Sequence, residues 1–492
     1  MLLQVYSRIA TMLSKFQGEG FSARYSVLLI YFVSTFSTVA ISFFSTPLLI
    51  RTLEIREFGR WALVEPFQMV LSQSMLLGVN HGIIKALNLD KFILSKTFRR
   101  LGVAAQPALV LFSIAGGGVL SVIGFSPGEA ALFGATCYFE ATLLFILYTF
   151  RGGHLAYGYS VGSVTRSLVF LALLALDGSE WIGGYRVDRL VDVLFIRWIA
   201  ASAGVLAGLS VGMRERRSLK EEVFDIPGRW DLYRDSIRYG MPLMVTGLLT
   251  MVVTYADRYV LKQYFDYRSL VEYVVHLKIA AVLNPMIMAP FSIWWPTERF
   301  RRMEDPDGGS SFFRRLTYIL LASYLFVGGG IWLFAPWIIR WFAPAIPLQP
   351  RILLVLLCSM VFMGMGPPMN VGLLNKGKTH LNIYAVLVGA IFQLAACLLV
   401  IPRYGALGAA SATALSFLFY TGMLNYISQK VYRVPFAYGY MALIFSLGVF
   451  LMAGLHHWLA PDRFLDCMAS SIYYGVLFAI SSYGVYRTGV LK

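Results

Sequence analysis

Seven charged side chains and two histidines interrupt apolar stretches that are long enough to cross a membrane. They are Arg166, Arg197, Arg258 and Lys278, the acids Glu65, Glu140 and Asp257, and the histidines His81 and His276. A charged residue at the centre of a membrane helix costs about 2.5 to 3.5 kcal/mol on insertion scales. Each of them therefore needs an oppositely charged partner or a water-filled cavity.

Two of the arginines lie deep in their apolar stretches. Arg166 and Arg197 are each about seven residues from the nearer end, or roughly 10 Å at about 1.5 Å per residue. Their side chains cannot easily reach the membrane surface from that depth. We predict that both line a polar cavity, and the alternative is a buried ion pair with no role in binding.

The acids and the lysine admit two interpretations. Glu140, midway along its stretch, and Glu65, near the start of another, could carry protons or could compensate the charges of the arginines. Asp257 and its neighbour Arg258 point in different directions on a helix, so they need not pair with each other. His276 and Lys278 are two residues apart and face differently, and we predict that Lys278 is the one that reaches the cavity.

The elements that position these residues are membrane helices. The 492-residue chain is 58% hydrophobic and only 14% charged, far from the averages of soluble domains. A membrane helix needs roughly 20 mostly apolar residues, and the chain divides into about fourteen such stretches. We place them at residues 25–50, 61–84, 101–124, 130–150, 160–176, 190–211, 236–261, 271–295, 316–339, 352–374, 381–401, 406–429, 436–458 and 468–486.

This division predicts an all-α integral membrane protein without a soluble domain. The two largest gaps, residues 212–235 and 296–315, are far shorter than the roughly 50 residues at which independent domains begin. The four cysteines are far apart, and no spacing indicates a disulfide framework, a metal site or a cofactor. No module of basic and aromatic residues typical of nucleic-acid binding is present.

Basic residues predict the orientation in the membrane. Of the 42 lysines and arginines, 27 fall at the termini or in the loops after even-numbered stretches, and 11 fall in the other loops. Cytoplasmic loops carry the excess of positive charge, so we expect both termini in the cytoplasm. Residues 1–20 carry apolar side chains at helical spacing, which predicts an amphipathic segment on the cytoplasmic membrane surface.

A faint internal repeat suggests how the helices are grouped. RTLEIREFGRWALVEPF, from Arg51, aligns without gaps with QYFDYRSLVEYVVHLKI, from Gln263, at an offset of 212 residues. We therefore predict two six-helix lobes, residues 21–211 and 236–429, related by a pseudo-two-fold axis along the membrane normal. A cytoplasmic linker, residues 212–235, would join them, and residues 430–492 would form an extra helix pair. The GMGPP sequence suggests a hinge at Gly364, Pro367 and Pro368.

Three stretches resemble a known family. They are STPLLIRTLEIREFGRWAL from Ser45, SIRYGMPLMVTGLLTMVVTYADRYVLKQYF from Ser236 and GLLNKGKTHLNIYAVLVGAIFQLAACLLVIPRYGALGAASATALS from Gly372. Together they resemble the polysaccharide transporter, or O-antigen flippase, family of the multidrug/oligosaccharidyl-lipid/polysaccharide (MOP) exporter superfamily. The chain departs from the pattern by placing Glu54 and Glu57 around an extra Arg56, and only some members have the final helix pair.

The resemblance implies a V-shaped pair of lobes around a central cavity in the bacterial inner membrane. It implies alternating access, an undecaprenyl-diphosphate-linked oligosaccharide as cargo for surface polysaccharide such as lipopolysaccharide, membrane lipids and polysaccharide-assembly proteins as partners, and H⁺ or Na⁺ as coupling ion. Guanidinium groups suit a diphosphate because their planar fork donates paired hydrogen bonds. The expected headgroup residues are thus Arg166, Arg197, Arg258 and Lys278, and the residues for ion coupling or charge pairing are Glu65, Glu140 and Asp257.

Three other functions remain open. A peptidoglycan-precursor (lipid II) flippase of the same superfamily shares the cationic cavity and the extra helix pair. A drug or cation antiporter of the superfamily would favour an acidic, aromatic cavity, and here basic residues predominate at depth. A membrane enzyme such as a polymerase or ligase would carry a large external loop, whereas the external loops here are short.

The orientation can be tested with reporter fusions. We expect alkaline phosphatase fused at Lys220 or Arg302 to be inactive, because basic residues concentrate in these loops. Fusions in the loop near Arg268 should be active in the same experiment. Phosphatase activity at Lys220 would reverse the orientation and the side from which cargo loads.

Overall fold

The computed structural model describes residues 23–88, 94–153, 155–177, 186–216, 229–302, 305, 309–375, 381–459, 468, 472 and 474–478. The predicted amphipathic segment 1–20 lies outside these residues. The regular secondary structure of the described residues is all helix, without strands, so the predicted fold class is confirmed. Ten of the described helices are long and apolar enough to cross a membrane.

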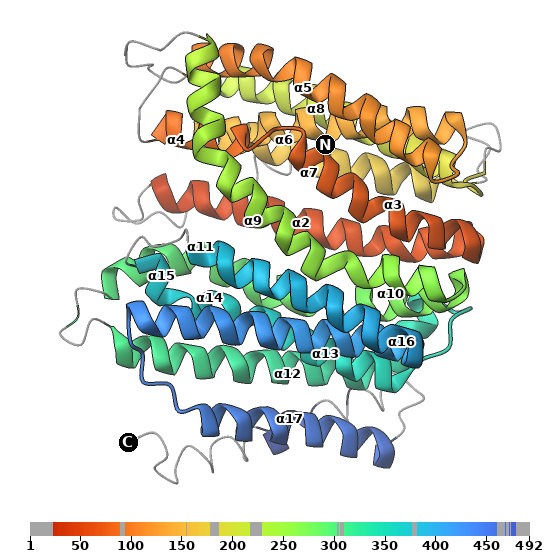
Figure 1. Cartoon of the computed structure of the whole chain (residues 1–492), viewed down its shortest axis with the longest axis vertical. Helices are drawn as coiled ribbons and strands as arrows, with labels where there is room; N and C mark the ends of the chain where they lie inside the picture. Colours follow the sequence, from red (N-terminus) through yellow and green to blue (C-terminus); the bar gives the residue numbers. More distant parts are fainter. Residues whose placement is uncertain are drawn as a thin grey trace.

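The helices lie nearly parallel in layers, with the N-terminal group above the C-terminal group in Figure 1. The first group comprises α2 (Ala23–Thr52), α3 (Ile55–Ser74), α4 (Val79–Asn88), α5 (Leu94–Val122), α6 (Pro127–Gly152), α7 (Ala156–Ala175) and α8 (Leu190–Arg216). The second comprises α9 (Arg229–Tyr264), α10 (Tyr267–Ala281), α11 (Leu283–Arg302), α12 (Ser310–Phe342), α13 (Pro350–Gly364), α14 (Gly366–Met369), α15 (Val371–Asn375), α16 (Asn382–Val431) and α17 (Tyr438–Leu459).

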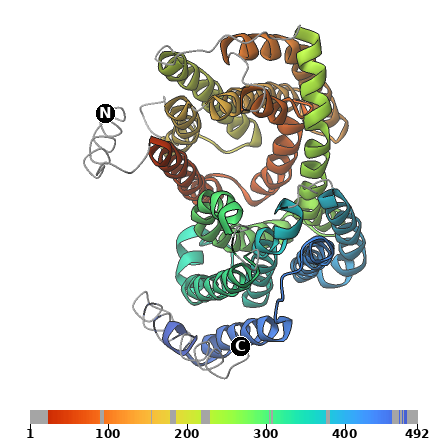
Figure 2. The same ribbon diagram turned by 90° about the vertical axis from the view of Figure 1, so that its left-hand side faces the viewer.

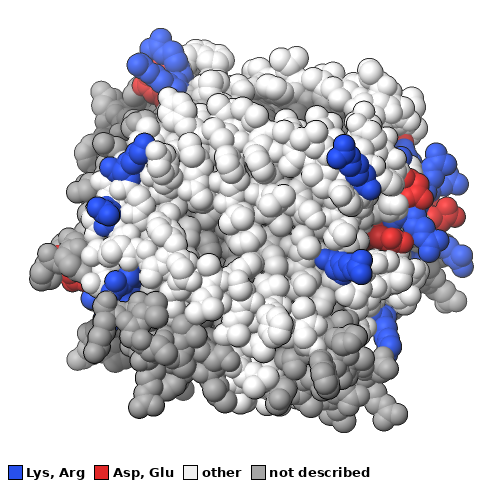
Figure 3. All heavy atoms as spheres, turned by 60° about the horizontal axis from the view of Figure 1, so that its bottom comes forward, with Lys and Arg blue, Asp and Glu red and all other residues white. Residues whose placement is uncertain are grey.

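Much of the apolar surface faces outward, as expected of helices in lipid. Leu111, Ile114 and Phe450 are among the large apolar side chains that are exposed. The face drawn in Figure 3 has a broad uncharged belt, and its charged residues gather at the two edges, which are the ends of the helices. Such a belt matches the hydrocarbon core of a bilayer, about 30 Å thick.

Three predicted helices are divided into shorter elements in the structure, one by a break in the backbone and two by turns within a continuous apolar span. The predicted helix 61–84 is split between α3 and α4, where Leu77 and Gly78 have positive φ angles of 48° and 81°. The predicted helix 271–295 is split between α10 and α11, and the predicted helix 352–374 is split into α13, α14 and α15. Conversely α16 contains two predicted helices, 381–401 and 406–429, which meet at a kink where Gly405 has φ 57°.

Helix ends follow the 212-residue offset of the internal repeat. In the first copy α2 ends at Thr52 and α3 begins at Ile55, and in the second copy α9 ends at Tyr264 and α10 begins at Tyr267. The joint of the second copy is closed by Asp266, whose carboxylate accepts a hydrogen bond from the Ser269 backbone N–H at 2.9 Å. This bond holds the pKa of Asp266 below its ordinary value.

The other predicted boundaries are partly met. Helices α8 and α9 extend from both sides into the predicted linker 212–235. Helix α17 packs against α12 as the first of the two extra helices. Of the predicted helix 468–486, residues 474–478 are helical, and most of the remainder lies outside the described residues.

One long helix joins the two groups. Helix α9 packs along α16 and also crosses α3, α4 and α5 of the first group. In Figure 2 it runs from the N-terminal helices above to the C-terminal helices below. At the crossing with α4 the two backbones touch, because a Cβ built on Gly240 would lie 1.9 Å from the Gly78 carbonyl oxygen. Only glycine permits this approach.

We expect Gly240→Ala to lower the melting temperature of the purified protein. The added methyl group meets backbone rather than a flexible side chain, and overpacking of this kind costs about 1 to 3 kcal/mol. Gly247→Ala is the matched control, because it lies on the same helix with no atom within 4 Å of the added Cβ. Equal melting temperatures for the two variants would show that α4 and α9 do not touch at Gly240.

Candidate functional site

A polar cavity of about 340 Å³ lies among the N-terminal helices and reaches the first helix after α9. Its charged lining consists of Glu65 on α3, Glu140 on α6, Arg166 on α7, Arg197 on α8 and Lys278 on α10. Its neutral polar lining consists of Ser42, Ser45, Thr46, Gln68, Ser72, Gln73 and Ser167. Five of the seven charged residues singled out in the sequence thus meet in one place.

The five charged side chains form a chain of alternating sign. Arg166 Nη1 lies 2.9 Å from Glu140 Oε2, and Arg197 Nε lies 3.5 Å from Glu140 Oε1. Arg197 continues to Glu65 at 3.8 Å, and Lys278 Nζ lies 2.9 Å from the other Glu65 oxygen. Three cations share two carboxylates, so the chain carries one excess positive charge.

Aromatic rings fix the central member of this chain. The Arg197 guanidinium lies 5.1 Å from the centre of the Trp61 ring and 5.9 Å from that of Phe170. Cation–π contacts of this length are attractive. Trp61 is itself fully buried, so the Arg197 guanidinium lies against an indole ring that is held in place by packing. Arg166, with 30% of its side chain exposed, is the cation most open to a ligand.

Close packing of α7 and α8 brings the two arginines together. Gly158 and Gly162 on α7 face Gly204, Gly208 and Gly212 on α8, and a Cβ on Gly162 would lie 3.2 Å from the Gly208 Cα. Glycines spaced by four residues let membrane helices approach closely. Arg166 continues the α7 row by one more turn, so its side chain emerges at the helix contact.

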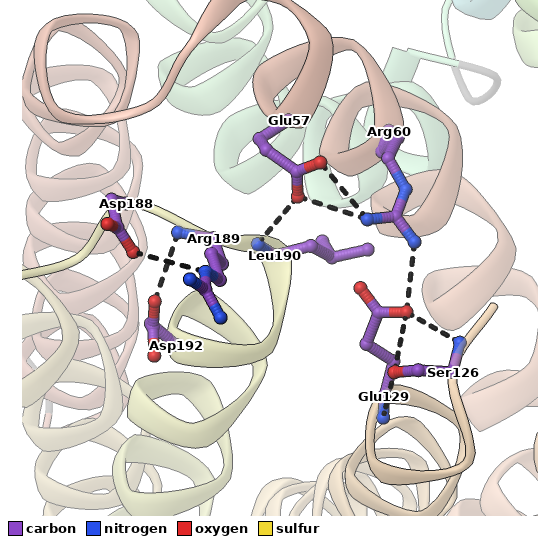
Figure 4. A network of polar contacts seen from close by, with 8 residues as sticks. All are labelled: Glu57, Arg60, Ser126, Glu129, Asp188, Arg189, Leu190 and Asp192. Carbon is purple, nitrogen blue, oxygen red and sulfur yellow. Dashed lines mark hydrogen bonds and ion pairs between the residues drawn. The ribbon is translucent and has the colours of Figure 1, made fainter.

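Polar contacts at the helix ends hold three of the site helices in register (Figure 4). Arg60 of α3 pairs with Glu57 at 3.1 Å and with Glu129 of α6 at 2.9 Å. Ser126 and Glu129 form a reciprocal capping box at the start of α6. Glu57 also accepts a hydrogen bond from the Leu190 N–H at the start of α8, at 3.0 Å.

Two predicted residues lie outside the cavity lining. Arg258 is buried, donates to the Ala62 carbonyl at 3.3 Å and lies over the Tyr255 ring. Asp257 is fully buried among the C-terminal helices, where it accepts hydrogen bonds from Tyr273, from Thr413 at 2.9 Å and from the Arg258 backbone N–H at 2.7 Å. The described partners of Asp257 are thus neutral donors rather than a cation of the cavity.

The structure also locates the His276 and Lys278 pair and the predicted hinge residues. His276 points away from the cavity, and its Nε2 accepts from the Gln349 backbone N–H at 2.9 Å, so Lys278 is the member of that pair that lines it. Gly364 ends α13, and Pro367 and Pro368 lie in the short α14, so the suggested hinge coincides with a helix break. Its movement stays a prediction.

The cavity lining includes residues that are not among the predicted site residues. Gln68 and Ser72 follow Glu65 at spacings of three and seven, which places all three on one helical face. Ser42, Ser45 and Thr46 of α2 carry no comparable signal in the sequence. The glycine rows of α7 and α8 are a recognisable signal that would have predicted how Arg166 and Arg197 meet.

We expect Glu140→Gln to destabilise the protein. The change leaves Arg166 and Arg197 without their shared carboxylate, and breaking a buried ion pair costs about 3 to 5 kcal/mol. Glu272→Gln is the control, since its partner Arg268 is 64% exposed and such pairs contribute about 0 to 1 kcal/mol. Thermal unfolding in detergent measures both, and a control that loses as much as Glu140→Gln would contradict the shared pairing.

Comparison with known proteins identifies solved structures that have a similar fold. No model of a protein family and no curated protein sequence matches this chain. Among solved structures it is similar to the lipid II flippase MurJ in an inward closed conformation, with TM-score 0.65 and 13% identity over 94% of this chain and 100% of MurJ. It is also similar to an inward-facing multidrug resistance MATE transporter, with TM-score 0.59 and 13% identity over 80% and 94% of the two chains.

A third similar structure is a point mutant of the Vibrio cholerae MATE transporter VcmN, with TM-score 0.57 and 15% identity over 83% of this chain and 96% of VcmN. Identities this low establish architecture rather than substrate. The chain thus has the fold of the MOP-superfamily transporters.

Proposed function

We propose that this protein is a flippase that moves an undecaprenyl-diphosphate-linked oligosaccharide from the cytoplasmic to the outer leaflet by alternating access. The observation that carries the proposal is the cavity in which Arg166, Arg197 and Lys278 outnumber two carboxylates. A diphosphate can replace carboxylate oxygens as the partner of these cations, because both present paired acceptors to a guanidinium fork. The MOP-superfamily fold supports transport rather than catalysis.

The acidic residues divide into two roles under this proposal. Glu65 and Glu140 pair directly with cations, so we assign them to charge pairing. The donors that contact Asp257 are neutral: two hydroxyl groups and one backbone N–H. Asp257 is therefore our candidate for coupling to H⁺ or Na⁺. The protein would lie in the bacterial inner membrane with both termini in the cytoplasm.

A second candidate is a flippase for the peptidoglycan precursor lipid II. It is favoured by the likeness to MurJ, which extends over 94% of this chain, whereas the likeness to VcmN extends over 83%. Both cargoes present a diphosphate to the cavity. Rescue of a bacterial strain depleted of its own lipid II flippase would select this candidate, and failure of rescue together with restored surface polysaccharide in a flippase-deficient strain would select the first.

A drug or cation antiporter fits the cavity less well. Its cargo is positively charged, and the excess of one cation over the carboxylates would repel it. Resistance to cationic drugs upon expression would favour this function over both flippase candidates.

We expect Arg166→Lys and Arg197→Lys each to reduce saccharide export per molecule of protein by about tenfold. Lysine keeps the charge but loses the paired donors, and each lost 1.4 kcal/mol corresponds to about tenfold. Arg166→Ala and Arg197→Ala should lose more. The readout is exported saccharide divided by the amount of protein in the membrane.

The control is Arg268→Lys, at a mostly exposed residue outside the cavity, which should export normally. A purely structural role predicts a different pattern, with less protein but a normal ratio. If both alanine variants kept the wild-type ratio, Arg166 and Arg197 would be removed from the headgroup site.

A further inference from the structure

The cavity is lined by charged and by neutral polar side chains. The charged ones come from α3, α6, α7, α8 and α10, and the neutral ones come mainly from α2 and α3. We infer that the neutral side chains of α2 and α3, with Gln68 among them, bind the sugar attached directly to the diphosphate. The inference rests on the proposed function and adds the part of the cargo that the cations do not explain.

Gln68 is the strongest indication of a ligand. Its side chain lines the cavity but is 1% exposed, and neither its amide nitrogen nor its amide oxygen has a hydrogen-bond partner among the described residues. Leaving a buried polar group unpaired costs about 1 to 3 kcal/mol. An apolar residue would avoid this cost, so an amide here is explained by a partner that is not part of the chain.

Two hydroxyl groups in the lining of the same cavity restrict what that partner is. Ser45 donates its proton to the Ile41 carbonyl at 2.9 Å, and Thr46 donates to the Ser42 carbonyl at 3.2 Å. Each hydroxyl has one proton, so both offer only acceptor lone pairs to the cavity. A ligand that donates several hydrogen bonds fits them, as the hydroxyl groups of a sugar do and the oxygens of a diphosphate do not.

The amide of Gln68 completes this match. It offers one acceptor and two donors in a plane, which complements two adjacent sugar hydroxyls or an acetamido group. Phe170 and Met69 also line the cavity and provide apolar surface for the C–H face of a sugar ring.

The size of the cavity indicates how much of the cargo is recognised. Its volume of about 340 Å³ is near the lower end of pockets that hold small ligands, about 300 to 1,000 Å³. A whole oligosaccharide does not fit in such a space. The site therefore reads the junction of diphosphate and first sugar, and it leaves the remaining sugars unread.

The test uses the purified full-length protein and two groups of probes. One is undecaprenyl diphosphate without sugar, and the other is a panel of undecaprenyl-diphosphate-linked monosaccharides that includes N-acetylglucosamine, N-acetylgalactosamine, glucose and galactose. Dissociation constants are measured by native mass spectrometry. We expect the wild-type protein to bind at least one sugar-bearing probe more tightly than the bare diphosphate.

Gln68→Met is the decisive variant, because it keeps the length of the side chain and removes the amide. We expect it to weaken binding of the preferred sugar-bearing probe by about tenfold and to leave the bare diphosphate unaffected. Its melting temperature should not fall, since an unpaired polar group has been removed. Gln68→Leu should behave alike, and Gln106→Met, outside the cavity, should change neither constant.

The other possible results of this experiment would overturn either the inference about the sugar or the proposed function. Equal effects of Gln68→Met on both kinds of probe, or no effect on either, would overturn the inference and leave the proposed function standing. A wild-type protein that prefers no sugar-bearing probe over the bare diphosphate would also overturn it. A wild-type protein that binds no probe at all would overturn the proposed function, and the inference with it.

Discussion

The cost of placing charge in a medium of low dielectric constant governs the organisation of the site. Arg166, Arg197 and Lys278 lie in helical stretches that are long and apolar enough to cross a membrane, where an unpaired charge is costly. In this protein two carboxylates are shared among the three cations, so each cation has a partner. Because each carboxylate contacts two cations, the positions of the five charged side chains depend on one another. The excess charge then belongs to the group rather than to one residue.

Sharing of this kind demands accurate placement of helices. Glu140 reaches both arginines only because the glycines of α7 and α8 let the two backbones approach closely. At the ends of the helices the contacts of Arg60 and Glu57 join α3, α6 and α8. The glycine contact fixes α7 against α8, and the end network fixes α3, α6 and α8, so α8 is held at two different depths. The cavity is therefore lined by a part of the structure that resists both rotation and sliding.

The sequence was sufficient for the fold class and for most of the helices, because hydropathy measures the cost of placing each residue in lipid. It also indicated that Arg166 and Arg197 lie deep and that Lys278 faces a different way from His276. It did not reveal the break at Leu77, since a leucine with positive φ has no signature in composition and is held there by packing. It did not indicate that Asp257 and Arg258 lie outside the cavity lining, because hydropathy contains no information about which neighbouring helix a buried charged residue contacts.

The continuity of α9 has a mechanical consequence. This single helix of 36 residues contacts α4 near its start and α16 over much of its length, so a change of angle between the two groups of helices has to be absorbed within α9 itself. Pro242 lies two residues after the contact at Gly240, and a proline inside a helix cannot donate to the carbonyl four residues earlier, here that of Arg238. The helix is thus softest just after its contact with α4. Any change of angle between the two groups would therefore bend α9 beside this contact rather than at its middle.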